Sequence, residues 1–270
     1  MRKKQSKIII IFLLLGSVIM MFPFFWMIIT SFKTVGEANQ MPPTMYPHKF
    51  SVDAYRRLFE AMPFFLYLRN TLILVAYAFW GLLLSAMAGY GFSKYKFKHK
   101  EVYFVLVLGT MMIPYQVIMI PNFLTLNQLG LVNTFLGMAL PSLVSAFAIF
   151  LFRQFMTSIP DDIIEAARIE GLSEVKIFFK IILPMSKPVI AIQAILVFIG
   201  SWNSFLWPLI VAQSQDKYTL SIGLSLMQGQ NTADMPVQMA GATLMLLPIL
   251  IIFFFLQKYI IEGYNTSGIK

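Results

Sequence analysis

Charged side chains that could bind another protein gather in one internal stretch of this sequence. Residues 165–171 read Glu-Ala-Ala-Arg-Ile-Glu-Gly, and residues 181–184 read Ile-Ile-Leu-Pro. The stretch lies between two apolar runs that are each long enough to cross a bilayer. A link between two such runs needs only a few polar residues. We therefore interpret the stretch as a docking element for a soluble partner.

Start and stop signals divide the stretch into two short helices. Pro160-Asp161-Asp162 is typical of a helix start, and Gly171 ends that helix, because glycine accepts the left-handed conformation at low cost. Its expected apolar face consists of Ile163, Ile164 and Ala167, and Glu165 and Arg168 are expected to lie together at i, i+3. Ser173 is expected to cap the second helix, and Pro184 to end it.

Two other interpretations of this pattern stay open. A DNA-binding helix-turn-helix also uses a glycine turn, but both ends of this stretch run directly into apolar segments, which leaves no room for a supporting third helix. The second is an amphipathic helix that lies on the membrane surface without a partner.

The composition is that of a membrane protein. Of 270 residues, 58% are hydrophobic and only 12% are charged, whereas a soluble domain has about a quarter of its residues charged. Apolar runs without period-two alternation exclude strands as the spanning element. We predict an all-α membrane protein, a single transmembrane domain over 1–270 with six transmembrane helices at 8–30, 70–92, 102–120, 132–152, 188–211 and 239–261.

The basic residues predict how the chain crosses the membrane. Most Lys and Arg residues lie before the first span, between the second and third, in the 153–187 loop and after the sixth. By the positive-inside rule this places both termini and the 153–187 loop in the cytoplasm of a prokaryote's cytoplasmic membrane. The basic N-terminus and its apolar run resemble a signal peptide, but the run is long and lacks a small-residue cleavage site, so we expect an uncleaved first span. This topology suffices to explain the net charge of +9, so membrane lipid but no nucleic acid is expected as a partner.

The predicted spans hold essentially no ionisable residue away from their ends. A charge at mid-span costs about 3 kcal/mol and is seldom kept without a use, which argues against a proton-coupled pump or a voltage sensor. The polar residues that remain could bind a neutral solute such as a sugar, or could join helices through hydrogen bonds. The candidate translocation-path residues are Gln116, Gln193, Trp202 and Asn203.

No catalytic or metal site is predicted. His48 and His99 lie in segments on opposite sides of the membrane, and there are no cysteines. The chain also lacks the G-x-x-x-x-G-K-[S/T] phosphate loop. If this protein drives uphill transport, a partner must supply the energy.

At this point the sequence resembles a known family. The E-A-A…G…I-L-P pattern at Glu165, Ala166, Ala167, Arg168 and Gly171, closed by Leu183 and Pro184, resembles the cytoplasmic signature of permease subunits of binding-protein-dependent ABC importers. The segment 201–210 (Ser-Trp-Asn-Ser-Phe-Leu-Trp-Pro-Leu-Ile) looks like the fifth-span pattern of the carbohydrate-uptake group. Residues 129–134 (Leu-Gly-Leu-Val-Asn-Thr) look like its third outer turn.

The resemblance implies a type I importer permease without enzymatic activity of its own. It implies a second homologous permease subunit, two ATPase subunits that bind ATP and Mg, and an extracellular or periplasmic solute-binding protein that meets the outer loops 31–69 and 212–238. The short helix near Glu165 would then dock into an ATPase cleft as a coupling helix.

The tail resembles that of the maltose-type second permease but departs from its commoner form. Gly268, Ile269 and Lys270 are the residues that would contact the ATPases. Alternatives to sugar import are a permease for a polyol or glycerol phosphate, and a membrane scaffold or receptor that only tethers cytoplasmic proteins.

Overall fold

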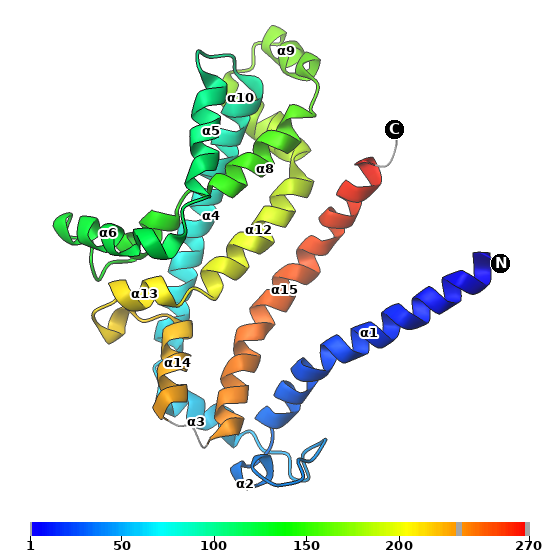
Figure 1. The fold of residues 1–270 in the computed structure, drawn as a ribbon, viewed down its shortest axis with the longest axis vertical. Helices are drawn as coiled ribbons and strands as arrows, with labels where there is room; N and C mark the ends of the chain where they lie inside the picture. Colours follow the sequence, from blue (N-terminus) through cyan, green and yellow to red (C-terminus); the bar gives the residue numbers. More distant parts are fainter. Residues whose placement is uncertain (1, 231–233, 268–270) are drawn as a thin grey trace. The chain divides into compact units, whose positions relative to one another are not determined.

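The computed structural model describes residues 2–230 and 234–267, and the described chain is helical without a strand (Figure 1). The predicted all-α membrane fold is therefore confirmed. Three described helices are long and apolar enough to span a bilayer: α1 (Arg2–Ser31), α4 (Phe64–Lys94) and α15 (Met235–Ser267). Their apolar stretches contain 23, 31 and 25 residues, against about 20 needed to cross the hydrocarbon core.

The other apolar runs form bent pairs of helices. The helix α5 (Lys100–Thr110) meets α6 (Tyr115–Gln128) at 97°. Between them stands Pro114, which has no N–H to donate and disfavours a helical residue before it. Next, α7 (Phe135–Ala139) with η1 (Leu140–Ser142) meets α8 (Ala146–Thr157) at 51°. The region predicted as one span at 102–120 thus consists of parts of two helices.

The fifth apolar run is also divided. A bend of 83° separates the segment Glu174–Met185 from α12 (Lys187–Trp202). After α12 the chain leaves the helix at Asn203 and forms α13 (Leu206–Val211). Because α12 has only 16 residues, it is about 24 Å long, and α13 completes the apolar run that was predicted as one span at 188–211.

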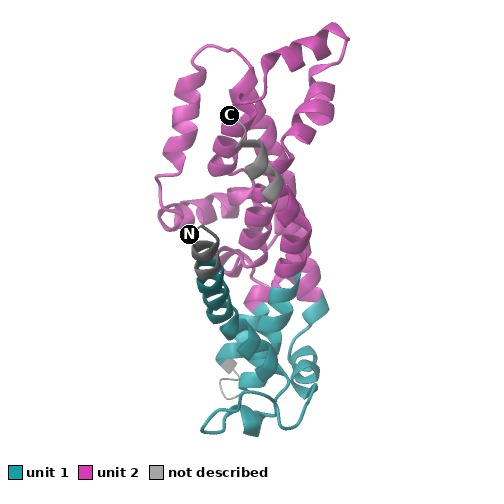
Figure 2. Ribbon diagram, turned by 90° about the vertical axis from the view of Figure 1, so that its right-hand side faces the viewer, with its two compact units in different colours: residues 1–65, 223–248 teal, residues 66–222, 249–270 magenta. Residues whose placement is uncertain are grey.

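Shorter helices complete the described chain. They are α2 (Val35–Ala38), α3 (Asp53–Ala61), α9 (Asp161–Ile169), α10 (Glu174–Ile177), the π-helical turn η2 (Phe178–Ile182), α11 (Leu183–Met185), η3 (Gln215–Lys217) and α14 (Leu220–Gln230). The chain divides into two compact units, Met1–Phe65 with Gly223–Pro248, and Leu66–Ile222 with Ile249–Lys270 (Figure 2).

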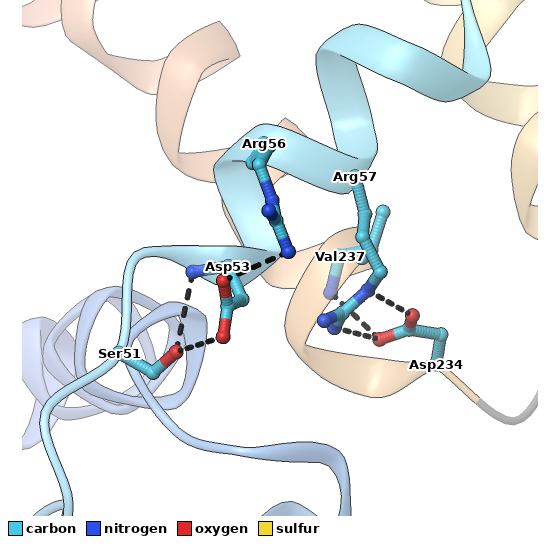
Figure 3. Close-up of polar contacts among 6 residues, drawn as sticks. All are labelled: Ser51, Asp53, Arg56, Arg57, Asp234 and Val237. Atoms are coloured by element: carbon cyan, nitrogen blue, oxygen red, sulfur yellow. Dashed lines mark hydrogen bonds and ion pairs between the residues drawn. The ribbon is translucent and has the colours of Figure 1, made fainter.

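The first unit is held together by aromatic packing and one bidentate ion pair. The ring of Phe32 lies 4.7 Å from that of Phe50 and 5.3 Å from that of Tyr55. Arg57 donates to both carboxylate oxygens of Asp234 at 3.0 and 3.1 Å (Figure 3). The same carboxylate accepts the backbone N–H of Val237 in the first turn of α15, so Asp234 both caps α15 and ties it to α3.

The second unit has a core built around α4. Its buried members include Leu82, Ala86 and Tyr90 of α4, with Phe152 of α8. Gly81 allows the close approach that this core requires, because a Cβ there would lie 1.6 Å from the carbonyl oxygen of Leu143. The segment 129–134 also has a structural role, since the backbone N–H of Asn133 donates to the Val211 carbonyl and its side-chain oxygen accepts from Gln213 and Ser214.

We expect Asp234→Ala to lower the free energy of unfolding by about 1–2 kcal/mol, because it removes a helix cap together with a partly exposed bidentate ion pair. Tryptophan fluorescence during thermal unfolding of the purified protein measures this. Asp53→Ala is the matched control, because its ion pair with Arg56 is largely exposed; equal midpoints for the two variants would contradict the role given to Asp234.

Candidate functional site

The helix α9 has one buried and one exposed face. It begins at Asp161 directly after Pro160, as predicted, with Asp161 and Asp162 in its first turn. Ile164 and Ala167 are buried against the core of the second unit. Glu165, Ala166 and Ile169 are exposed, and 87% of Ile169 is accessible. The exposed face of α9 thus combines a carboxylate, a small residue and one apolar side chain.

Gly171 ends α9 as the sequence predicted. Its φ of +82° lies in the left-handed region, where a side chain would be strained. The N–H of Gly171 donates to the carbonyl of Arg168 at 3.0 Å, and the N–H of Leu172 donates to that of Ala167 at 3.1 Å. These two bonds define a Schellman cap, which directs the chain sharply into α10.

Arg168 pairs with a different acid from the one expected. Its guanidinium donates to both carboxylate oxygens of Glu174, at 2.7 and 3.3 Å, rather than to Glu165. The turn at Gly171 brings Glu174 to the end of α9, where it offers a bidentate partner that Glu165 on the same helix does not. The Arg168 guanidinium, and then the Tyr95 hydroxyl, lower the pKa of Glu174. Within the described chain, no ion pair engages Glu165.

The second helix of the loop continues past the expected stop. Ser173 occupies the cap position of α10 but makes no capping hydrogen bond through its side chain. Leu183 is half-buried and Pro184 is exposed, and both lie within α11, which reaches Met185. The prediction that Pro184 ends the helix is wrong, because the wider π-helical turn η2 precedes it and a helix can tolerate a proline where its hydrogen-bond pattern is already altered.

Two neighbouring residues at the end of α4 contact this loop, and the sequence analysis did not select them. The ammonium group of Lys94 donates to the carbonyl of Ile159 and, at 2.7 Å, to the carboxylate of Asp161. The hydroxyl of Tyr95 donates to Glu174 at 2.6 Å. In the sequence both residues belong to a basic segment that the positive-inside rule already explains, so no local signal distinguished them.

The four polar candidates for a translocation path do not come together. Gln116 on α6 and Asn203 after α12 are exposed. Gln193 is 2% accessible and its amide nitrogen has no partner among the described residues. Trp202 is 1% accessible and stacks on Phe198 with ring centroids 5.4 Å apart. Gly268, Ile269 and Lys270 lie outside the described residues.

A cavity of about 360 Å³ lies elsewhere in the second unit, and none of those four residues lines it. Its walls come from α4, the α7–α8 region and the segment 197–208. Of the described residues that line it, none is charged. The polar groups lining it belong to Ser85, Tyr115, Ser142, Ser145, Ser201, Ser204 and Trp207.

One of these groups has hydrogen-bonding capacity to spare. The Trp207 indole nitrogen is buried without a partner among the described residues, and its ring lies edge-on to Tyr115 with centroids 6.1 Å apart. A volume in the range of about 300–1,000 Å³, with apolar walls and a few polar groups, is typical of a small-molecule site.

Comparison with known proteins identifies the family. Residues 81–265 match the family described as binding-protein-dependent transport system inner membrane component. The chain is 36% identical to the arabinooligosaccharides transport system permease protein AraQ of Halalkalibacterium halodurans, over 100% of both chains. It is 34% identical to the lactose transport system permease protein LacG of Rhizobium radiobacter, over 94% of this chain and 92% of that protein.

A solved structure confirms the fold. A chain from a bacterial ABC transporter involved in the import of the acidic polysaccharide alginate superposes with a TM-score of 0.83. It covers 96% of this chain and 98% of that one at 24% identity, which supports a type I permease fold. The chain therefore belongs to the family of inner membrane components of binding-protein-dependent transport systems, and the predicted resemblance is confirmed.

We expect Gly171→Ala to weaken the end of α9 by about 1 kcal/mol, because alanine resists a positive φ and no neighbour limits the space there. Gly171→Asn should cost less, since asparagine tolerates the left-handed region. Hydrogen exchange of the amides in 165–177 measures this local opening, and about fivefold faster exchange in the alanine variant corresponds to the expected loss. Identical exchange in the two variants would contradict the requirement for a left-handed conformation at residue 171.

Proposed function

We propose that this chain is the transmembrane permease subunit of an ATP-driven importer that moves a neutral sugar or oligosaccharide across the cytoplasmic membrane. Separate ATPase subunits hydrolyse ATP and bind Mg; a second homologous permease and an external solute-binding protein complete the importer. This chain contributes transport rather than catalysis. Its termini and the 153–187 loop lie in the cytoplasm, in keeping with the distribution of basic residues.

The observation that carries the proposal is the exposed face of α9. Its buried face anchors the helix to the second unit, while Glu165, Ala166 and Ile169 are presented outward. The small Ala166 allows close approach of a groove, Ile169 provides apolar contact, and Glu165 offers a charge that no described residue of this chain neutralises. An ATPase with an apolar cleft and a basic residue would fit this face; Gly171, Leu183 and Pro184 shape the loop behind it.

The uncharged cavity supports a neutral solute. Arg and Lys side chains are the usual partners of a phosphate or carboxylate, and the described lining has no charged side chain. Hydroxyls and an indole N–H suit the many hydroxyl groups of a saccharide. The printed names of the two relatives, arabinooligosaccharides and lactose, agree with this chemistry. We therefore favour sugar over glycerol phosphate and place the solute path at this cavity. Along the rest of the path we place Gln193 and Trp202 of α12, Asn203 at its end, and Gln116, which is next to Tyr115 in the chain.

The outer segments 31–69 and 212–238 are proposed to meet the solute-binding protein. A scaffold that only tethers cytoplasmic proteins would also expose a helix such as α9. It would not need a cavity lined with hydroxyl groups, and it would show no ATP hydrolysis that responds to sugar in the assembled complex.

We expect Glu165→Lys and Gly171→Pro to abolish ATP-driven sugar uptake while the protein still inserts into the membrane. The first reverses the charge on the docking face, and the second removes the left-handed turn, because proline requires φ near −65°. Uptake into proteoliposomes of the assembled importer measures this. Lys98→Glu, a charge reversal at an exposed position outside the 153–187 loop and the outer segments, is the control; wild-type uptake in both loop variants would refute coupling through α9.

We expect Ser204→Asp to slow the uptake of arabinotriose by at least about tenfold, because it puts an unpaired carboxylate into the cavity at a cost of several kcal/mol. Asn127→Asp adds the same charge at an exposed position outside both the cavity and the 153–187 loop and should transport normally. The amount of assembled complex is measured in parallel. Normal uptake by an assembled Ser204→Asp importer would show that the sugar avoids this cavity.

A further inference from the structure

Lys94 and Tyr95 hold the loop at two separate points. Lys94 is the last residue of α4, and only 5% of its side chain is accessible. Its ammonium group lies against the carbonyl of Ile159 and the carboxylate of Asp161, which are the residues on either side of Pro160. The beginning of α9 is thus bonded directly to the end of α4. The hydrogen bond from the Lys94 ammonium lowers the pKa of Asp161, so this carboxylate is charged at neutral pH.

The second point lies at the other end of α9. Glu174 opens α10 and accepts a hydrogen bond from Tyr95 as well as the bidentate contact from Arg168 in the last turn of α9. The ring of Tyr95 packs edge-on against Tyr90, with centroids 5.4 Å apart, and Tyr90 lies 5.5 Å from Phe178. Through Glu174, Tyr95 therefore fixes the end of α9 and the start of α10.

Two attachments at opposite ends restrain a short helix more strongly than one, because a single contact leaves the helix free to pivot about it. Apolar packing already holds Ile164 and Ala167 in the core, so the polar contacts are not needed to keep the loop folded. The polar contacts fix the orientation of α9 relative to the end of α4, because hydrogen bonds to charged partners are strong and geometrically specific. A displacement of α9 is then passed to α4 rather than absorbed in the loop.

The helix α4 leads from this attachment to the cavity. Leu74, Ala78, Leu82 and Ser85, all on α4, line the cavity described above. A helix that is attached to α9 at its end and forms a wall of the cavity along its middle provides a continuous physical connection between them.

We propose that Lys94 and Tyr95 are positioning residues that transmit movement of α9 to α4 and so couple ATP hydrolysis to solute movement; this inference rests on the proposed function. Each acts through another group, Lys94 through Asp161 and Tyr95 through Glu174. Neither touches the ATPase face formed by Glu165, Ala166 and Ile169 in the chain as described.

The test uses the complete importer in proteoliposomes, with Lys94→Met, Tyr95→Phe and the double variant. Methionine keeps the length of the side chain without its charge, and phenylalanine removes only the hydroxyl. The measured quantity is arabinotriose imported per ATP hydrolysed. We expect the double variant to assemble and hydrolyse ATP but to lose about tenfold in this ratio. Lys98→Met and Tyr103→Phe, at exposed positions, should keep the wild-type ratio.

A second measurement separates this inference from the proposed function. Because the chain has no cysteine, spin labels can be attached at Met87→Cys on α4 and at Ser173→Cys, an exposed serine that follows the cap of α9. We expect the distance distribution between the labels to broaden in the double variant and to stay narrow in the two controls. An importer that shows no ATP-driven uptake even in the wild type would refute the proposed function, whereas unchanged distances and an unchanged ratio in the double variant would overturn the role of Lys94 and Tyr95.

Discussion

The constraint on which this structure depends is that lipid cannot solvate charge. A charged group in the hydrocarbon core costs several kcal/mol, so a chain with long apolar helices must keep its ionic chemistry at their ends. The 153–187 loop and the end of α4 collect acids and bases that bind one another through Lys94–Asp161, Arg168–Glu174 and Arg153–Glu101. A soluble ATPase could bind at such a charged surface. The described lining of the cavity in the second unit, in contrast, offers only neutral polar groups.

The loop is a folded part of the second unit rather than a flexible link. Ile164, Ala167, Ile177 and Ile182 belong to the same buried cluster as Leu82 and Phe152, so the loop and the apolar helices share one core. The cost of ordering the loop is met by that packing. Several of the ion pairs are half-exposed, so they contribute less to stability than the packing does. Their main effect is to fix the orientation of the loop relative to α4.

Sequence reasoning was most successful where local chemistry decides the structure. The start of α9 at Asp161 and its end at Gly171 follow from backbone rules that operate within one turn. It was less successful where distant segments meet. The partner of Arg168 depends on the turn that delivers Glu174, and the division of 102–120 into two helices depends on how the chain bends at Pro114. The cavity was not foreseen, because serines scattered from Ser85 to Ser204 become neighbours only in the folded chain.

The sequence by itself determined that this is a helical membrane protein, where α9 begins and ends, and which family it belongs to, since hydropathy, caps and a spaced motif are properties of adjacent residues. Only the tertiary structure decided which face of α9 is outward, that Lys94 and Tyr95 attach it to α4, and which hydroxyl groups share a cavity. These depend on contacts between segments far apart in the chain, and such contacts leave no regular spacing to read, because packing and bond geometry select them after the helices have formed.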